Sequence, residues 1–377
     1  MTFFPRASAS VSNFGPSADG KTFMGRAPAG ATVAILKNGT QDGTATADAS
    51  GLWTYTFASA PLATDKIKPR SSVDGVEISG IGTVSPPAPG AQFQSWKTAL
   101  DAQAAGTKAA RLIVIGDGNT AGQTAGQGTV LPAGAKATSW PSKVAEAYGS
   151  AGSTDSFFGS QNTASFNPYT ASTSTSYDPR VLMSGVTLGG SSLACIGFPF
   201  VLGSASASVA FTPAKAVDTV EVYYLKDGSA GVASVNVDGG AALTSLSRTG
   251  PAKSLTKATL TFAKGTHTIN LAWTSGSFVL VGMIAYDSMS KDIQVINLGL
   301  DAASITDLTK SSDAYSYLNA LPVLGADAAI VQQPYKDMQT GLALPTFRGG
   351  VQSLVQSLKD AGLDVLMVTG TPYDPRR

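Results

Sequence analysis

The stretch RLIVIGDGNTAG, residues 111–122, is the part of this chain whose residue types and spacing could carry chemistry. An apolar run leads into a Gly-rich turn, and hydrolases often present a reactive side chain on such a strand-to-helix turn at the carboxyl edge of a sheet. The turn contains Asp117 and Thr120, but Gly118 stands where the reactive side chain would be. The setting for acyl transfer is therefore present without a nucleophile.

A catalytic base is also missing from this region. Acyl transfer by a hydroxyl nucleophile needs an imidazole base and hydrogen-bond donors for the developing oxyanion. The only histidine among the 377 residues is His267, in the segment GTHTINLAW. This alternating pattern predicts an exposed imidazole at the end of a strand. Because loss of a nucleophile or a base typically lowers turnover by about 10⁶-fold, we expect an inactive site.

A dinucleotide site is disfavoured at the same turn. Gly116-x-Gly118-x-x-Ala121 formally matches the phosphate-binding fingerprint. That motif needs an acidic residue about twenty positions further on to bind the ribose. No acidic residue lies between Asp117 and Glu146, so we expect no nucleotide cofactor.

A metal centre has no better support. The carboxylates of Asp301, Asp307 and Asp337 are scattered without the spacing of metal ligands. The single cysteine, Cys195, excludes a multi-cysteine site and has the apolar neighbours of a buried, inert thiol. We therefore expect neither a metal nor any other cofactor.

The composition excludes several classes of partner. The chain has 26 Lys and Arg residues and 25 Asp and Glu residues, so its net charge is +1. No overall electrostatic field therefore favours binding of nucleic acid. No apolar run reaches the roughly 18 residues of a membrane-spanning helix. The start, MTFFPRASAS, lacks the basic and apolar segments of a signal peptide. We expect no nucleic acid, no membrane insertion and no Sec export.

The elements around the Gly-rich turn predict a doubly wound α/β domain formed by residues 93–185 and 288–377. Short apolar runs typical of strands buried on both faces occur at residues 111–115, 293–297, 328–332 and 364–368. Helical patterns occur from Phe93 to Leu100, from Trp140 to Tyr148 and from Val351 to Lys359. Strands that alternate with helices predict a parallel sheet.

About 180 residues separate the first two of these strands, far more than a crossover needs. Residues 186–287 consist of alternating runs joined by Gly, Asp and Asn, which predicts an inserted jelly-roll-like β-sandwich of the kind found in carbohydrate-binding modules. Residues 150–180, rich in Ser, Thr, Asn and Tyr, are expected to form a long loop near its root.

The amino-terminal part is expected to be a separate β-sandwich over residues 7–85, with residues 1–20 as an arm or leading strand. Asn38-Gly39 favours a two-residue hairpin turn, because both residues tolerate positive φ angles. Trp53, Tyr55 and Phe57 alternate with threonines and so share one face of a strand. Residues 86–92 form a Pro-rich linker.

The sequence blocks around the Gly-rich turn resemble those of the SGNH (GDSL) hydrolases, flavodoxin-like esterases that remove acyl groups from lipids and glycans. The first block is kept in VIGDGNTAG except that Gly118 replaces the serine, and the aspartate at this place, Asp117, is expected to brace the turn. The second block resembles INLGLDAAS, where Ala302 takes the place of the oxyanion glycine. In the third, Pro334 and Tyr335 stand near the expected asparagine, and the final Asp-x-x-His block is absent. The resemblance implies a flavodoxin-like fold with a degenerate site.

A second resemblance concerns residues 7–85. The segment GRAPAGATVAILKNGTQDGTATADASGLWTYTF is similar to bacterial and phage immunoglobulin-like repeats. This resemblance implies an immunoglobulin-like β-sandwich.

Aromatic side chains on the insertion and its flanking loop are the candidates for binding a ligand. Flat apolar rings can stack on sugars. The candidates are Tyr169, Tyr177, Tyr223, Tyr224 and Trp273. Adjacent residues of a strand point to opposite faces, so we expect one ring of the Tyr223-Tyr224 pair to be buried and the other to be available.

The features together favour a phage virion protein, such as a fibre, spike or head decoration, that contacts host cell-surface glycans. A low-charge surface suits an extracellular β-rich protein, and a virion protein folds in host cytoplasm yet works outside after lysis without an export signal. We expect docking on other virion proteins through residues 1–20 and a homo-oligomer, a trimer in a fibre or spike. The alternatives are an active carbohydrate acetyl-esterase and a secreted, extracellular bacterial adhesin.

Overall fold

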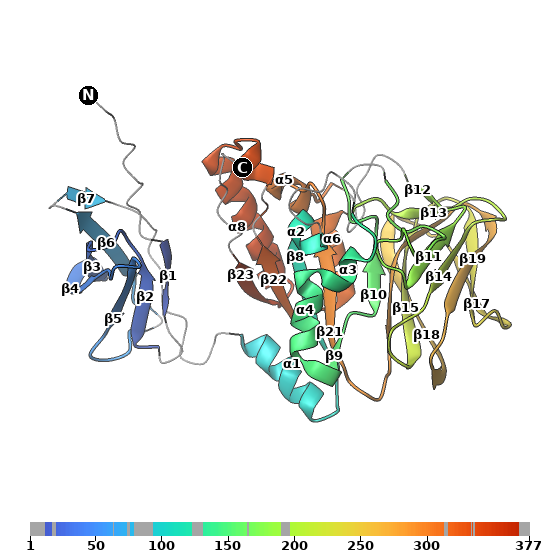
Figure 1. Cartoon of the computed structure of the whole chain (residues 1–377), viewed down its shortest axis with the longest axis horizontal. Coiled ribbons are helices and arrows are strands. Elements are labelled where there is room, and N and C mark those ends of the chain that lie inside the picture. The colour runs from blue at the N-terminus through green and yellow to red at the C-terminus, as the bar shows by residue number, and fades with distance from the viewer. Residues whose placement is uncertain are drawn as a thin grey trace. The chain divides into compact units, whose positions relative to one another are not determined.

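The computed structural model divides the chain into two compact units, Met1–Gln94 and Ser95–Arg377 (Figure 1). It describes residues 12–16, 20–62, 64–73, 76–78, 93–122, 131–163, 166–189, 197–312, 316–332, 334 and 336–368. Antiparallel sheets make up the described part of the first unit, and a parallel sheet with helices plus two antiparallel sheets make up the second. The expected class, α/β combined with β-sandwich sheets, is confirmed. None of the described helices has the length and apolar character needed to cross a membrane.

The described strands of the first unit form two antiparallel sheets. The three-stranded sheet consists of β1 (Ser12–Pro16), β2 (Thr22–Arg26) and β5 (Leu52–Thr56). The four-stranded sheet has the order β4 (Thr40–Thr46), β3 (Thr32–Lys37), β6 (Ile67–Val73) and β7 (Val76–Ile78). Strand β1 lies inside the segment expected to be an arm, and it pairs with β2 through its backbone without needing a side-chain period. The rest of residues 1–19 and the linker at 86–92 lie outside the described residues.

The turn and the aromatic stripe of this unit form as expected. Asn38 and Gly39 join β3 to β4 with φ angles of 53° and 87°. Trp53 and Phe57 are 1% and 3% exposed and pack with other apolar side chains in the core of the unit. Alternation therefore predicted correctly which face of β5 is buried.

The parallel sheet of the second unit has five strands. Their order is β9 (Gly152–Ser153), β21 (Ile293–Gly299), β8 (Ala110–Gly116), β22 (Ala328–Gln332) and β23 (Asp364–Val368). Every pairing is parallel. The chain runs from β8 to β21 on one side and later returns to β22 on the other, which is the winding of a flavodoxin-like sheet with β9 added at its edge. All residues of β8 and β21 are buried, because both faces of the sheet are covered.

Helices and the insertion together cover the two faces of this sheet. Helices α1 (Gln94–Ala104) and α4 (Trp140–Ala147) pack on one face, against residues such as Leu112 and Val295. Helix α8 (Leu344–Asp360) packs on the other through Leu354 and Leu358. The shorter helical segments are α2 (Gly118–Ala121), α3 (Ala135–Thr138), η1 (Gly149–Ala151), α5 (Ile305–Leu308), α6 (Tyr317–Ala320), η2 (Leu321–Leu324) and α7 (Lys336–Gln339).

The insertion is a sandwich of two antiparallel sheets. One sheet has the order β12 (Thr187–Leu188), β13 (Phe200–Leu202), β20 (Phe278–Tyr286), β15 (Val217–Lys226) and β18 (Ser254–Gly265), with β10 (Ser156–Phe158) also paired to β20. The other has the order β11 (Val181–Ser184), β14 (Ser208–Phe211), β19 (Ile269–Gly276), β16 (Gly231–Val237) and β17 (Ala242–Ser247).

Two features of the insertion differ from the expectation. Strands β10 and β11 precede residue 186, where the insertion was expected to begin, and β10 lies within the stretch 150–180 that was expected to be a loop. Strands of three or four residues are too short to show a period. The sheet containing β15 and β20 also packs against the parallel sheet, since Val281 and Tyr223 share one core with Ile113 and Ile296. The sandwich is therefore built onto the α/β domain and replaces a covering layer of helices.

Candidate functional site

The candidate site lies where the carboxyl ends of β8, β21 and β22 meet. In an open α/β sheet, ligands bind at the point where the chain leaves neighbouring strands in opposite directions. Here that point lies between β8 and β22, because β21 and β22 flank β8 on its two sides. The Gly-rich turn after β8 opens directly onto it.

The turn itself is built as a short, capped helix. Asp117 precedes α2, and its carboxylate accepts a hydrogen bond of 3.0 Å from the backbone of Asn119. Helix α2 ends at Gly122, which has a φ of 112° that favours glycine. Gly118 is buried at the first position of the helix. The aspartate therefore braces the turn, and no side chain extends from the nucleophile position.

The hydroxyl of Thr120, two residues further along the turn, is already bonded. Thr120 is fully buried, and its hydroxyl donates to Gln332 Oε1 at 2.6 Å. The indole of Trp140 donates to the same oxygen at 2.9 Å. A hydroxyl fixed as the donor to an amide oxygen, with no imidazole beside it, is not activated for attack.

Gln332 is the residue that sequence reasoning missed. The block comparison pointed to Pro334 and Tyr335, but Pro334 is buried and Tyr335 lies outside the described residues. One sequence feature could have pointed to Gln332: it lies at the carboxyl end of an apolar strand, next to the point between β8 and β22 where ligands bind in such sheets.

Hydrogen bonds connect the end of β21 to the turn after β8 and to the segment that follows β10. Asn297 donates to the carbonyl of Thr120 at 2.9 Å and accepts from the backbone of Gly299 at 2.9 Å. Gln161 donates to the carbonyl of Asn297 at 3.0 Å. Gln161 and Ala302 both have positive φ angles, 49° and 57°, which are costly for residues other than glycine. Ala302, at the position where the resemblance places a glycine, therefore has a left-handed backbone.

A buried carboxylate lies beside this connection. Asp301 is 2% exposed and accepts a hydrogen bond of 3.2 Å from Asn162. Burial, reinforced by the charge of Asp117, raises the pKa of Asp301 to about 6. Burial also raises the pKa of Asp337. One carboxylate oxygen of Asp337 accepts a hydrogen bond of 2.7 Å from the backbone of Ile305. Asp301 could exchange a proton near neutrality, but the turn offers it no nucleophile to activate.

The histidine belongs to the sandwich, not to this site. His267 lies between β18 and β19, where its Nδ1 is 2.7 Å from the carboxylate of Asp238 and its Nε2 is 2.8 Å from the carbonyl of Ala263. The bond to Asp238 raises the pKa of His267. The imidazole therefore links the end of β18 to the turn that follows β16.

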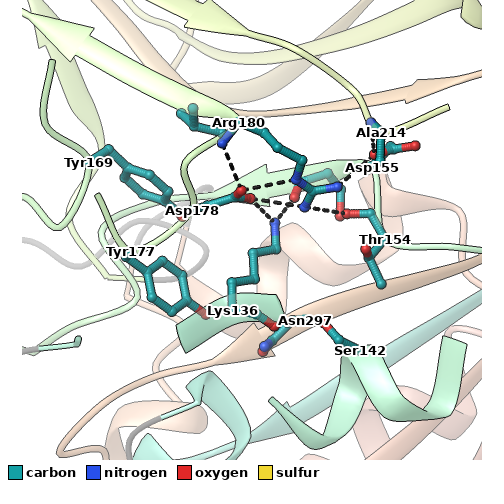
Figure 2. Close-up of polar contacts among 12 residues, drawn as sticks. Lys136, Ser142, Thr154, Asp155, Tyr169, Tyr177, Asp178, Arg180, Ala214 and Asn297 are labelled. Carbon is teal, nitrogen blue, oxygen red and sulfur yellow. Dashed lines mark hydrogen bonds and ion pairs between the residues drawn. The ribbon is translucent and has the colours of Figure 1, made fainter. Parts of the chain in front are cut away.

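A cluster of buried charges joins the α/β domain to the sandwich (Figure 2). Lys136 from α3 points at Asp178, 3.0 Å away, and also donates to the carbonyl of Ser156. Arg180 forms two hydrogen bonds to the carboxylate of Asp178, at 2.9 and 3.0 Å, and one of 2.7 Å to Asp155. The cluster links α3 to β10 and to the segment before β11.

The electrostatics of the cluster follow from its burial. Desolvation lowers the pKa of Lys136. Desolvation opposes ionisation of Asp178 as well, but the charges of Lys136 and Arg180 outweigh it and hold its pKa below the usual range. Lys136 and Asp178 are each 2% exposed. The arrangement is an enclosed ionic clamp, and sequence reasoning missed it because its members are isolated polar residues in different segments.

The structure places four of the five aromatic binding candidates in the core. Tyr169, Tyr177, Tyr223 and Tyr224 are at most 5% exposed. The hydroxyl of Tyr223 donates to Glu221 at 2.5 Å in the core shared with the α/β domain, and Tyr224 packs on Phe278 inside the sandwich. The expectation that one ring of this pair is available is wrong, because the parallel sheet covers the outer face of β15.

Trp273 is the candidate that keeps an exposed part. It is half-buried, and its Nε1 donates to the carbonyl of Gly276 at 2.7 Å, which fixes the plane of the ring. The loop after it is held by Arg248, which donates to Ser277 and forms a bidentate pair with Asp227. A fixed indole therefore lies among polar loop residues at one end of the sandwich.

The sequence matches no protein-family model and no curated protein. Similar solved structures include a peptidoglycan O-acetylesterase, with a TM-score of 0.48, 15% identity, and coverage of 72% of this chain and 71% of that one. A two-domain esterase active on acetylated mannans has a TM-score of 0.24 and 17% identity, with coverage of 29% and 34%. A family 6 carbohydrate-binding module from Clostridium cellulolyticum, in complex with xylose, has a TM-score of 0.23 and 18% identity, with coverage of 28% and 89%. These identities assign no activity to this chain.

Proposed function

We propose that this chain is a structural or adhesive protein of a phage virion whose esterase-like α/β domain is not hydrolytic and whose sandwich contacts host-surface glycans. One observation carries the non-hydrolytic part of the proposal. Gly118 occupies the nucleophile position, and the adjacent hydroxyl of Thr120 donates to Gln332. The domain then serves as a rigid base for the sandwich.

Two further features support the non-hydrolytic part. The chain's single histidine bonds to Asp238 and Ala263 within the sandwich, so it offers no imidazole to the turn. The ionic clamp of Lys136 and Asp178 is satisfied within the protein, so it offers no free base either.

The glycan part of the proposal depends on Trp273, on β19, and on the loops at that end of the sandwich. A half-exposed indole whose plane is fixed can stack on the apolar face of a sugar ring, and polar groups beside it can bond the sugar hydroxyls. Arg248 and Asp227 lie in the neighbouring loops and are paired with each other. The similar structures named above include a peptidoglycan O-acetylesterase and an esterase active on acetylated mannans, and we choose bacterial surface polysaccharides as the first ligands to test.

Hydrolysis is tested with p-nitrophenyl acetate and with acetylated glycans. The wild-type chain should show no turnover above background, and Gly118→Ser should show none either, because the hydroxyl gains no base. Turnover that survives purification and disappears in Asp117→Ala would support the alternative, an active carbohydrate acetyl-esterase.

Glycan binding is tested on an array of bacterial surface polysaccharides. Trp273→Ala should lower binding at least about tenfold, as loss of an aromatic anchor does, whereas Leu243→Ala, an exposed position on β17 of the same sandwich, should leave it unchanged. Equal binding by both variants would place any glycan site elsewhere.

The virion part of the proposal is tested by immunogold electron microscopy of purified particles. Deletion of residues 1–20 should abolish incorporation of the chain. A protein found only in the secreted fraction of a bacterial host would favour the adhesin alternative.

A further inference from the structure

Strand β18 forms a long free edge of the sandwich. With 12 residues it is the longest strand in the described part of the chain, and it ends the order β12-β13-β20-β15-β18. Its pairing with β15 uses one side of its backbone, and within the described residues no strand pairs with the other side. The imidazole of His267 contacts the carbonyl of Ala263 and closes the carboxyl end of this edge. Unpaired strand edges are templates for another strand.

The charges that usually protect such an edge are neutralised here. Proteins discourage edge pairing with exposed lysines. Lys257 of β18 lies 3.0 Å from Glu221, and Lys264 lies 2.6 Å from Asp287. Each lysine is therefore paired within the same chain, and the edge presents little net repulsion to a second copy.

The side chains of β18 alternate in a way that suits pairing with itself. Leu260 and Phe262 point toward the sandwich core but remain half-buried, because no further strand covers them. Thr259 and Thr261 are exposed on the opposite face. A strand added at this edge would extend the apolar row on one face and the threonine row on the other.

A two-fold axis through Leu260 brings complementary residues together. In antiparallel pairing about this position, Leu260 faces Leu260 of the second copy and Thr259 faces Thr261. Phe262 then faces Ala258, so an aromatic ring packs beside a small side chain. Lys257 and Lys264 face uncharged residues, Ala263 and Thr256, so this register places no like charges directly opposite each other.

We propose that β18 is a self-association edge that joins two copies of this chain into a continuous antiparallel sheet. Because His267 occupies the carbonyl of Ala263, the pairing comprises residues 258–262 from each copy and is about 17 Å long. A contact of that length buries less than the roughly 1,200 Å² typical of stable complexes. The dimer is therefore weak and depends on concentration, as suits subunits held close together in an assembly. This inference does not depend on glycan binding or on the state of the esterase-like site.

The test is sedimentation velocity of the full chain over a range of about 1–300 μM, a range chosen for weak complexes. The wild type should shift from monomer toward dimer as the concentration rises. The variant Thr259→Lys/Thr261→Lys places lysines opposite lysines in the dimer and should weaken it at least about tenfold. Lysine at position 259 faces Glu221 across the β15 pairing, so the monomer tolerates it. Glutamate is placed only at position 261, because at position 259 it would face Glu221 within the monomer. An equimolar mixture of Thr259→Lys and Thr261→Glu places opposite charges across the contact and should dimerise at least as well as the wild type.

The matched control is Ser245→Lys/Ser247→Lys, which adds the same charges to β17, the edge strand of the other sheet. This variant should dimerise like the wild type. Circular dichroism and thermal melting establish that each variant is folded. A wild type that stays monomeric throughout, or a dimer that Thr259→Lys/Thr261→Lys and Ser245→Lys/Ser247→Lys form equally well, would overturn the proposal.

Discussion

Removing the negative charge of Asp178 should destabilise the second unit more than removing the positive charge of its partner Lys136. The side chain of Asp178 is 2% exposed, and it is the one carboxylate bonded to both Lys136 and Arg180. Asp178→Asn leaves the ammonium of Lys136 buried without a carboxylate. Breaking a buried ion pair in this way costs about 3–5 kcal/mol.

Lys136→Met is the matched comparison. It removes the buried ammonium, but Asp178 keeps both hydrogen bonds to Arg180, and the new side chain is apolar and unbranched. We therefore expect a loss of at most about 2 kcal/mol, because the charge of Asp178 remains compensated by Arg180 and no buried charge is left alone.

The pH dependence follows from the sign of the pKa shift. The pKa of Asp178 is lower in the folded than in the unfolded state. Its stabilising contribution is therefore complete above the unfolded pKa of about 4 and is lost as the pH falls through the folded value. The difference in unfolding free energy between wild type and Asp178→Asn should be largest near pH 7 and should shrink toward pH 3.

Urea denaturation of the full chain at several pH values measures these differences, with the transition of the second unit fitted separately from that of the first. The reasoning would be refuted if Asp178→Asn cost less than Lys136→Met at pH 7, or if its cost did not change on acidification. Either result would mean that the ionic clamp does not hold α3 to the sandwich.

Two further perturbations test other parts of the second unit. Asp301→Asn should stabilise the second unit by about 1–3 kcal/mol at pH 7.5 and have little effect at pH 3.5. The pKa of Asp301 in the folded state, about 6, lies above its unfolded value, so the wild type loses stability as the pH rises from about 4 through 6. Urea denaturation at the two pH values checks this, and an equal effect at both would contradict it. Gly282→Ala should cost more than about 2 kcal/mol, because a Cβ there would lie 2.2 Å from the carbonyl of Phe157, whereas Gly228→Ala meets no atom within 4 Å and should change the free energy by less than about 0.5 kcal/mol. Comparable melting temperatures for these two glycine variants would show that β10 is not packed against β20 as described.

Local patterns in the sequence were sufficient for most of the fold. Continuous apolar runs marked β8, β21 and β22 as strands that are largely buried on both faces, because layers cover both sides of the parallel sheet. The run that forms β23 was expected to be buried in the same way, and this is wrong, because β23 is the edge strand of the sheet and leaves Leu366 and Val368 43% and 37% exposed. The dipeptide Asn38-Gly39 placed a hairpin turn, because few other residues tolerate its φ angles. Strands β10 and β11 were not predicted, because three or four residues are too few to show a period.

The candidate site was only partly predictable. The turn after β8 and the vacant position at Gly118 follow from residue identities alone. The bond from Thr120 to Gln332 joins residues 212 positions apart, and nothing in either local segment specifies the other. The block comparison pointed instead to Pro334 and Tyr335, two and three residues further along.

The sequence by itself determined most of the strands, where the turn lies and that the turn lacks a nucleophile, because these depend on residue type and short-range periodicity. Only the tertiary structure decided which surfaces remain open. Alternation correctly put Tyr223 and Tyr224 on opposite faces of β15, but the parallel sheet covers one face and the second sheet of the sandwich covers the other. The same holds for Lys136 and Asp178, whose charges are tolerated in the interior only because the fold brings them to 3.0 Å of each other. Burial is a property of what packs against a residue, and that partner comes from elsewhere in the chain.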